Sequence, residues 1–223
     1  MAMDANPSAS AEPYVVRRAG ANDVDAIARI WHVGWADGHV GHVPPELVRH
    51  RSEEQFAARA RQRLECTWVA EARDQIVGFV VVKGDEVEQI YVDRTARGMG
   101  VAATLLHKAE AEIRGAGHRR GWLAVVAGNQ RARSFYSRLG WRDAGAIMYA
   151  AETAVGPFAV PSHRYEIDLT DLAPDDRTGI DARHGSRKER GRGKTARVRR
   201  RVHAYTDAAR HTPVRGDLCR RQS

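Results

Sequence analysis

A short run of the chain, Arg97-Gly98-Met99-Gly100-Val101-Ala102, has the residue types that hold a phosphate group. Glycine has no side chain and adopts unusual backbone angles, so Gly98 and Gly100 allow a ligand to approach the backbone closely. A helix that begins directly after them leaves its first N–H groups without intrahelical partners, and its dipole adds roughly half a positive charge there. The chemistry that this run predicts is the binding of phosphate or pyrophosphate through backbone amides.

Three interpretations of this turn compete. Residues 98–103 formally match the dinucleotide fingerprint G-x-G-x-x-A. We reject it because that motif needs glycines almost on the strand end and an acidic residue about 20 positions later, where Arg119 and Arg120 lie. A P-loop is excluded, because no Lys-Ser or Lys-Thr follows the second glycine. A glycine-bearing helix start with no ligand is the third interpretation, and the turn alone does not decide against it.

A strand and a helix must position the turn. Residues 86–92 are β-branched and aromatic with acidic residues interleaved, which predicts a strand before it. The helix after it is indicated by one apolar stripe with a spacing of four residues, formed by Val101, Leu105, Ala109 and Ile113.

The turn and its strand together resemble a known family. Residues 97–102 resemble the pattern Arg/Gln-x-x-Gly-x-Gly/Ala of the GNAT-type N-acetyltransferase superfamily, in which this turn cradles the pyrophosphate of acetyl-CoA. Residues 90–93 resemble the end of that family's fourth strand. Ala102 stands where the second glycine is commoner, a choice that the pattern permits.

A second motif follows in the right order. Residues 129–141 resemble the family's half-motif Asn-x-x-Ala-x-x-Phe-Tyr-x-x-x-Gly-Phe/Trp, with every named position occupied. The apolar residues 122–126 predict a buried strand before it, and Gly140 is expected to end its short helix. The two motifs together are much more specific than either alone, and the resemblance covers roughly Tyr14 to Leu169.

The resemblance implies an α/β (α+β) fold: a GNAT-like, mixed, twisted sheet of about seven strands flanked by helices. The sheet is expected to splay between residues 87–92 and 122–126. The remaining strands are expected at residues 14–18, at a hairpin of 67–71 and 75–82, and at 144–152 and 163–169.

Two helices are expected between the first strands. The first has the buried stripe Val24, Ile27, Trp31 and Trp35 and is expected to weaken near Gly34 and Gly38. Residues 37–45 are expected to form a loop that Pro44-Pro45 stops. The second helix begins after Ser52, which with Gln55 has the spacing of a capping box. In GNAT-like proteins this region lines the acceptor side.

The resemblance also implies which residues hold acetyl-CoA. The thioester carbonyl is expected to meet a backbone N–H near Tyr91-Val92, and Asn129 to hydrogen-bond the pantetheine or to bridge the two strands. The expected acetyl-CoA-binding residues are Ile90, Tyr91, Val92, Arg97, Gly98, Met99, Gly100, Val101, Ala102, Asn129, Ala132 and Phe135. For the 3′-phosphate the candidates are Arg94, Arg131 and Arg133, although solvated surface charge is the favoured interpretation of each.

Acetyl transfer to an amine needs a neutral amine, a stabilised carbonyl oxygen and a proton for the leaving thiolate. Tyr136 is the candidate acid, since it falls off the core stripe of its helix and the leaving thiol, with a pKa of about 8.5, needs only a weak acid. A packed tyrosine with a satisfied hydroxyl is the alternative. Glu88 is the candidate base, directly or through water, with Glu86 on the same face in reserve; a charged rim residue remains the alternative for Glu88.

Composition bounds the partners. Residues 171–223 hold 15 Lys and Arg against 7 Asp and Glu, whereas residues 1–170 hold 21 of each, so the whole net charge of +8 lies in the tail. The folded part therefore gives no electrostatic argument for a nucleic-acid partner. We expect the N-terminal residues 1–12 and the basic tail to be disordered around an acetyltransferase domain of residues 13–170.

Three smaller features bear on the site and the compartment. Cys66 and Cys219 lie far apart, and we expect no disulfide framework. His39, His42 and His50 lack acidic or cysteine partners at metal-ligand spacing, so a solvated or substrate-facing loop is favoured over a metal site. Neither a signal peptide nor a membrane-spanning run is recognised, which indicates a cytoplasmic protein.

The sequence therefore predicts an acetyl-CoA-dependent N-acetyltransferase that acts on a primary amine, in small-molecule or peptide form, as a monomer or homodimer. The alternative is a non-catalytic CoA-binding or nucleic-acid-associated module that uses the basic tail. No motif in residues 37–51 identifies the acceptor.

Overall fold

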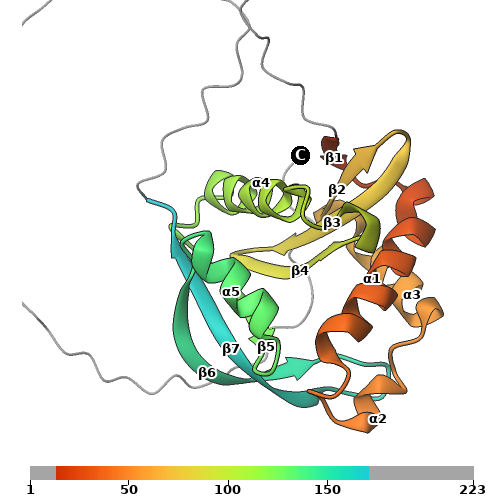
Figure 1. Cartoon of the computed structure of the whole chain (residues 1–223), viewed down its shortest axis with the longest axis vertical. Helices are drawn as coiled ribbons and strands as arrows, with labels where there is room; N and C mark the ends of the chain where they lie inside the picture. Colours follow the sequence, from red (N-terminus) through yellow and green to blue (C-terminus); the bar gives the residue numbers. More distant parts are fainter. Residues whose placement is uncertain (1–13, 171–223) are drawn as a thin grey trace, which may run out of the picture. The chain divides into compact units, whose positions relative to one another are not determined.

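The computed structural model describes residues 14–170 (Figure 1). Seven strands form one sheet in the order β1-β2-β3-β4-β5-β7-β6. In chain order they are β1 (Val15–Arg18), β2 (Thr67–Ala72), β3 (Gln75–Lys83), β4 (Glu86–Val92), β5 (Arg120–Val126), β6 (Arg142–Ala151) and β7 (Phe158–Asp168). All neighbours are antiparallel except β4 and β5, so the sheet is mixed, as predicted.

The parallel pair is joined at one end only. Glu86 and Trp122 are the single register pair between β4 and β5, and the Trp122 N–H donates to the carbonyl of Asp85 at 2.9 Å. By contrast, β5 pairs with β7 along its whole length. The sheet is therefore splayed beyond Glu86, as the sequence predicts.

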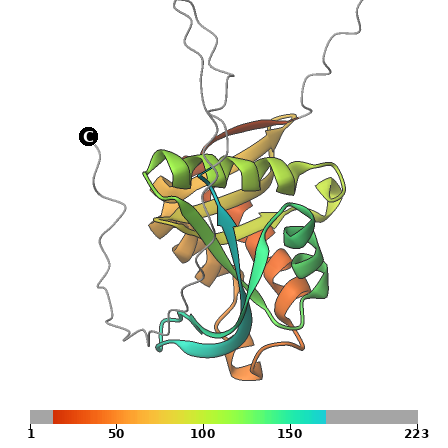
Figure 2. The same ribbon diagram turned by 90° about the vertical axis from the view of Figure 1, so that its left-hand side faces the viewer.

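Helices cover both faces of the sheet. On one face lie α1 (Val24–His39) and α3 (Glu53–Arg63), which pack side by side (Figure 1). On the other lie α4 (Val101–Gly115) and α5 (Gln130–Arg138), and Figure 2 shows α4 crossing the strands. Strand β3 serves both layers, because Val80 points into the core under α4 while Phe79 and Val81 point into the core under α1.

Helix α1 continues through two glycines that were expected to weaken it. A Cβ atom on Gly34 would lie 2.5 Å from the Tyr91 ring, and one on Gly38 would lie 2.8 Å from the side-chain amide of Asn129. Both glycines are therefore sites of close approach between α1 and the splayed strands. The prediction of a loop from residue 37 is wrong for residues 37–39 for this reason, because tertiary contact outweighs helix propensity.

The two prolines were expected to end a loop, but the second of them begins a helix. The short helix α2 (Pro45–Val48) begins at Pro45, which is tolerated at the first helical position because its missing N–H has no partner there in any case. The capping box of α3 is confirmed: the Ser52 backbone N–H donates to Gln55 Oε1 at 2.9 Å, and the Gln55 N–H donates to Ser52 Oγ at 3.4 Å.

Other expectations concern the chain ends. The expectation of no disulfide is not met at Cys66, which is disulfide-bonded. Cys219, the N-terminal residues 1–12 and the basic tail lie outside the described residues. Between residues 14 and 170, no helix is long and apolar enough to cross a membrane.

Candidate active site

A cavity of about 450 Å³ lies where β4 and β5 diverge. Its walls come from β4, β5, the glycine turn, the first turns of α4, helix α5, and the Gly34–Gly38 side of α1. It contains every expected acetyl-CoA-binding residue except Met99, together with Glu88 and Tyr136. Met99 is 55% exposed and lies on the outside of the turn. The two sequence motifs thus meet in one cavity.

The glycine turn presents unpaired amides to this cavity. Gly98 and Gly100 have φ angles of +83° and +84°, a backbone conformation that favours glycine. Within the described chain, no acceptor receives the N–H groups of Gly98, Gly100, Val101 or Ala102, whereas Ala103 donates to the Gly100 carbonyl at 2.9 Å. Four donors at the start of a 15-residue helix form a site for an anion.

The arginine of the turn has a structural partner. Arg97 Nη2 lies 2.7 Å from Asp37 Oδ2 on α1, and Arg94 binds the same carboxylate with two nitrogens. The hydrogen bonds from Arg94, followed by those from Arg97, lower the pKa of Asp37 to about 2. This pair of arginines fixes the turn against the end of α1. Arg94 is thereby committed to Asp37, and Arg133 is committed to Asp143 at 3.0 Å.

Helix α5 brings the second motif to the cavity. Asn129 caps the helix, with its Oδ1 accepting the Ala132 N–H at 3.1 Å, and Gly140 follows its end with a φ angle of +86°. The expectation that Tyr136 falls off the core stripe is wrong: Tyr136 is the buried residue of α5, 8% exposed, and packs among Phe135, Trp141 and Tyr165 while lining the cavity. Burial raises the pKa of the Tyr136 phenol above its ordinary value, so the group is protonated at neutral pH.

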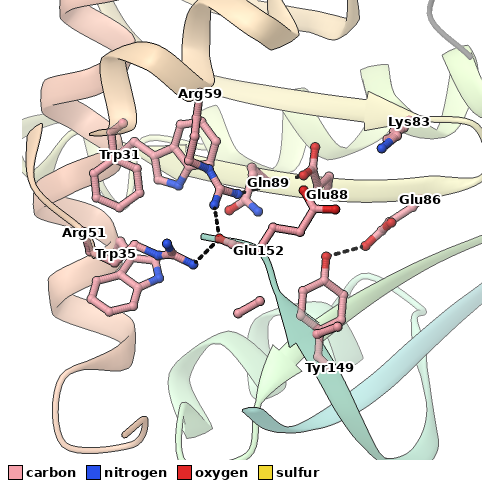
Figure 3. Close-up of a pocket in the computed structure, with 13 residues that line it drawn as sticks. Trp31, Trp35, Arg51, Arg59, Lys83, Glu86, Glu88, Gln89, Tyr149 and Glu152 are labelled. Carbon is pink, nitrogen blue, oxygen red and sulfur yellow. Dashed lines mark hydrogen bonds and ion pairs between the residues drawn. The ribbon is translucent and has the colours of Figure 1, made fainter. Parts of the chain in front are cut away.

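A second, smaller cavity of about 140 Å³ adjoins the first, and Glu88 and Gln89 line both (Figure 3). Its walls come from α1, α3, β4 and the end of the β6–β7 hairpin. Its lining residues are Trp31, Trp35, Arg51, Phe56, Arg59, Lys83, Glu86, Glu88, Gln89, Tyr149, Ala150, Ala151 and Glu152. Part of its lining comes from the region between the first two strands, for which the resemblance implies an acceptor-side position.

The two candidate bases have different partners. Glu88 is held by a two-pronged ion pair: Arg63 Nη2 lies 2.7 Å from Oε1, and Arg63 Nε lies 2.7 Å from Oε2. Glu86 accepts one hydrogen bond from the Tyr149 hydroxyl at 3.0 Å (Figure 3). Burial raises the pKa of Glu86 to about 7, with the Tyr149 hydrogen bond acting in the opposite direction. Glu86, the reserve choice, is therefore the carboxyl that changes charge near neutral pH.

The three histidines do not gather. His39 lies on α1, where its ring stacks on Trp35 at 4.9 Å and faces the larger cavity, and burial lowers its pKa to about 4. His42 packs on Gly128, and the His50 ring lies 5.6 Å from Phe158. Within residues 14–170, no three potential metal ligands come together.

Sequence reasoning missed several lining residues. Gly34, Gly38 and His39 reach the larger cavity from α1, and Arg51, Arg59 and Tyr149 reach the smaller one from three separate elements. Neither set has a spacing that a sequence motif could reveal. Arg131, one of the phosphate candidates, lines the larger cavity, as does Arg138.

Fold and cavity define a class of protein. The sequence profile of the acetyltransferase (GNAT) family matches residues 28–141, just over half of the chain. The chain belongs to this family, which confirms the resemblance and the fold class that it implied.

Individual relatives agree with this assignment. An uncharacterised N-acetyltransferase of Mycobacterium bovis and one of Mycobacterium tuberculosis are each 30% identical over 109 residues, which is 47% of this chain and 70% of theirs. Among solved structures, an N-acetyltransferase from Staphylococcus aureus Mu50 has a TM-score of 0.55 at 21% identity, covering 70% of this chain and 99% of that one. YncA from Salmonella typhimurium, a putative acetyltransferase solved with its cofactor acetyl-CoA, has a TM-score of 0.54 at 18% identity, covering 74% and 98%.

Proposed function

We propose that this protein transfers an acetyl group from acetyl-CoA to a primary amine. The observation that carries the proposal is the cavity between β4 and β5, which runs from the unpaired amides of the glycine turn to Tyr136 and Glu88. The donor set suits coenzyme A, because four free N–H groups match an anionic pyrophosphate and apolar walls match a pantetheine arm.

The residues of the chain have separate roles in this proposal. Backbone amides of residues 98–102 hold the pyrophosphate, and an amide near Tyr91-Val92 stabilises the carbonyl oxygen as it gains charge. Tyr136, neutral at pH 7, protonates the leaving thiolate. Ile90, Ala132 and Phe135 pack beside the bound arm. Arg131 faces the cavity and is our remaining candidate for the 3′-phosphate.

We assign the base to Glu86 and a positioning role to Glu88. Glu88 lies where the cavities meet, but Arg63 occupies both of its oxygens, so it suits holding an amine better than accepting a proton. Glu86 lies two residues away on the same strand, about 7 Å along it, a distance that one or two waters span. A cytoplasmic location and a monomeric or homodimeric state remain predictions of the sequence.

Binding and turnover test the proposal separately. Calorimetry with coenzyme A should detect one site, and the variant Gly100→Val, which forces a side chain into a positive-φ position at the turn, should lose it. Release of free thiol from acetyl-CoA with a panel of amines should follow. Coenzyme A binding without thiol release for any amine would favour the non-catalytic CoA-binding module, and no binding would contradict both.

A further inference from the structure

Two arginines that line the smaller cavity are largely buried, so their positive charges are desolvated. Arg51 is 7% exposed, and the Arg59 side chain is 18% exposed. Each guanidinium stacks over a tryptophan ring: Arg51 lies 5.6 Å from Trp35, and Arg59 lies 5.0 Å from Trp31. In Figure 3 both lie on the side of Trp31 and Trp35 and point toward Glu152, with Glu86 and Tyr149 on the opposite side of the cavity.

These charges have little compensation in the protein. Arg51 Nη2 and Arg59 Nη1 both donate to one neutral acceptor, the carbonyl of Glu152, at 3.0 and 2.9 Å. Among the described residues, no carboxylate pairs with Arg51, and Arg59 reaches Glu88 only at 4.0 Å. Arg59 Nε is buried and has no hydrogen-bond partner. Burial also lowers the pKa of Arg51 to about 10. Since buried charges are costly unless paired, this arrangement lacks an anion.

Resting on the proposed function, we propose that the acceptor is a small amino carboxylate, whose carboxylate binds Arg51 and Arg59 and whose amine lies at Glu88. A planar carboxylate suits the paired guanidinium donors. The separation fits as well, because Arg59 Nη2 and Glu88 Oε1 are 4.0 Å apart, so groups bound to each lie within a few bonds of one another. A cavity of about 140 Å³ has the size of a small amino acid.

The reaction at this site balances without a further reactant. The amine nitrogen forms a bond to the acetyl carbon as the carbon–sulfur bond breaks. The neutral amine loses one proton through water to the carboxylate of Glu86, and the thiolate gains one from Tyr136. Solvent exchange then returns a proton to the Tyr136 phenolate and removes the one on Glu86, so no net proton remains on the protein. The product is an N-acetylamino acid and free coenzyme A, and its carboxylate stays with the arginines throughout.

The first experiment needs no variant. Thiol release is measured with the 20 common L-amino acids; the best of them is compared with its carboxamide and with its decarboxylated amine. We expect the carboxylate to be preferred in kcat/KM by about 10–100-fold, the range of a charge-assisted contact. The carboxamide has the lower amine pKa, so availability of the neutral amine alone would give the opposite order. Equal or better use of the carboxamide would overturn the proposal.

Variants locate the contact. In Arg51→Gln and Arg59→Gln we expect the KM for the amino acid to rise about 10–100-fold and the carboxylate preference to collapse. Arg61→Gln is the matched control, because Arg61 is exposed on the same helix as Arg59 and outside the cavity. If the arginines only hold the Glu152 carbonyl, both variants will lower the Tm but leave the preference intact, which would contradict the proposal.

Binding separates this inference from the proposed function. The best amino acid, or each of the 20 if none is acetylated, is added without acetyl-CoA, and the Tm is followed. We expect a rise in the wild type and in Arg61→Gln, and none in Arg51→Gln. If this pattern of Tm changes is observed but no amine is acetylated, the proposed acetyl transfer is contradicted and the carboxylate site is supported. If amines are acetylated but amino acids do not change the Tm, the acetyl transfer is supported and the carboxylate site is contradicted.

Discussion

Glu86 and Glu88 show how environment assigns different roles to the same residue type. They lie two apart on β4, yet Arg63 neutralises one while the other is buried beside a neutral phenol. Arg63 holds both carboxylate oxygens of Glu88 in an ion pair. Desolvation destabilises the charged form of Glu86 and raises its pKa to about 7, against a reference value of 4.5.

The pH dependence of turnover follows from this difference. If Glu86 is the base, kcat/KM should rise with pH through about 7 and then level off, because only the carboxylate accepts a proton. In Glu86→Gln we expect kcat/KM to fall about 100-fold or more, and its pH profile to show no rise near pH 7. Glu88→Gln should keep the rise in kcat/KM near pH 7 while lowering the Tm, since it removes the two-pronged ion pair and leaves Arg63 with only the Glu152 carboxylate at 3.6 Å. If kcat/KM of Glu86→Gln still rises near pH 7, Glu86 is not the general base and Glu88 is again the candidate.

The raised pKa of Glu86 also predicts how the stability of the protein depends on pH. Its raised pKa means that its contribution to stability is fully present below pH 4.5 and is lost as pH rises through about 7, because the unfolded chain releases the proton more readily. Glu88 and Asp85 add to the rise in the pKa of Glu86, whereas the Tyr149 hydrogen bond and Lys83 oppose it. The Tm of Glu86→Gln relative to the wild type should therefore increase across that interval. A constant difference would show that the carboxyl is not desolvated.

Tyr136 can be tested by removing one oxygen atom. Its phenol has a raised pKa and, within the described residues, makes no hydrogen bond, so it remains a free donor in the cavity. Tyr136→Phe should lower kcat by about 100-fold or more with little change in the affinity for coenzyme A. The control is Tyr165→Phe, which removes a neighbouring buried phenol that does not line the cavity. Equal kinetics in the two variants would remove Tyr136 from catalysis.

At the scale of elements, α1 determines the shape of the cavity through its glycines. Glycine inside a helix ordinarily costs about 1 kcal/mol relative to alanine, yet a methyl group on Gly34 would overlap the Tyr91 ring. We expect Gly34→Ala to destabilise the protein by about 1–3 kcal/mol and to weaken coenzyme A binding, because α1 or Tyr91 must move.

A second glycine provides the control for this prediction. Gly115, the last residue of α4, has open space where a Cβ would lie and no positive φ angle. Gly115→Ala should therefore stabilise by a few tenths to about 1 kcal/mol and leave binding unchanged. Urea unfolding of both variants measures the difference. Stabilisation by Gly34→Ala would mean that α1 does not pack closely on β4.

These elements also show what sequence can predict. The positions of most strands, the capping box of α3 and the two cofactor-side motifs follow from local patterns, because alternation, caps and glycine turns are encoded in neighbouring residues. The splay was implied by the family resemblance, and β7 begins at Phe158, five residues before the expected start at residue 163. The close approach of α1 at Gly38 was not predictable, since the residue that it meets there, Asn129, is 91 positions away. The smaller cavity was not predictable either, because Arg51, Arg59 and Tyr149 lie far apart in the sequence and are brought together by the fold.

At the scale of the whole molecule, the charge is divided unevenly between the described part and the rest of the chain. Among the described residues, two apolar cores lie against the sheet, between Tyr14 and Leu169. Residues 1–170 carry 21 positive and 21 negative side chains, so the remaining 53 residues supply the excess charge of the chain. Fold and cofactor binding should therefore be separable from any electrostatic partner.

A chain ended after Thr170 tests this separation. We expect its Tm to lie within about 2 °C of the full-length value, equivalent to less than about 1 kcal/mol, and its coenzyme A affinity to be unchanged. Reducing buffer is used for both, so that Cys66 is a thiol in each. Binding to a DNA duplex, if the full chain shows it, should weaken steeply with salt and disappear on truncation, because only the tail has excess charge. Loss of coenzyme A binding on truncation would mean that residues beyond 170 complete the cofactor site, and the cavity between β4 and β5 would no longer suffice to explain it.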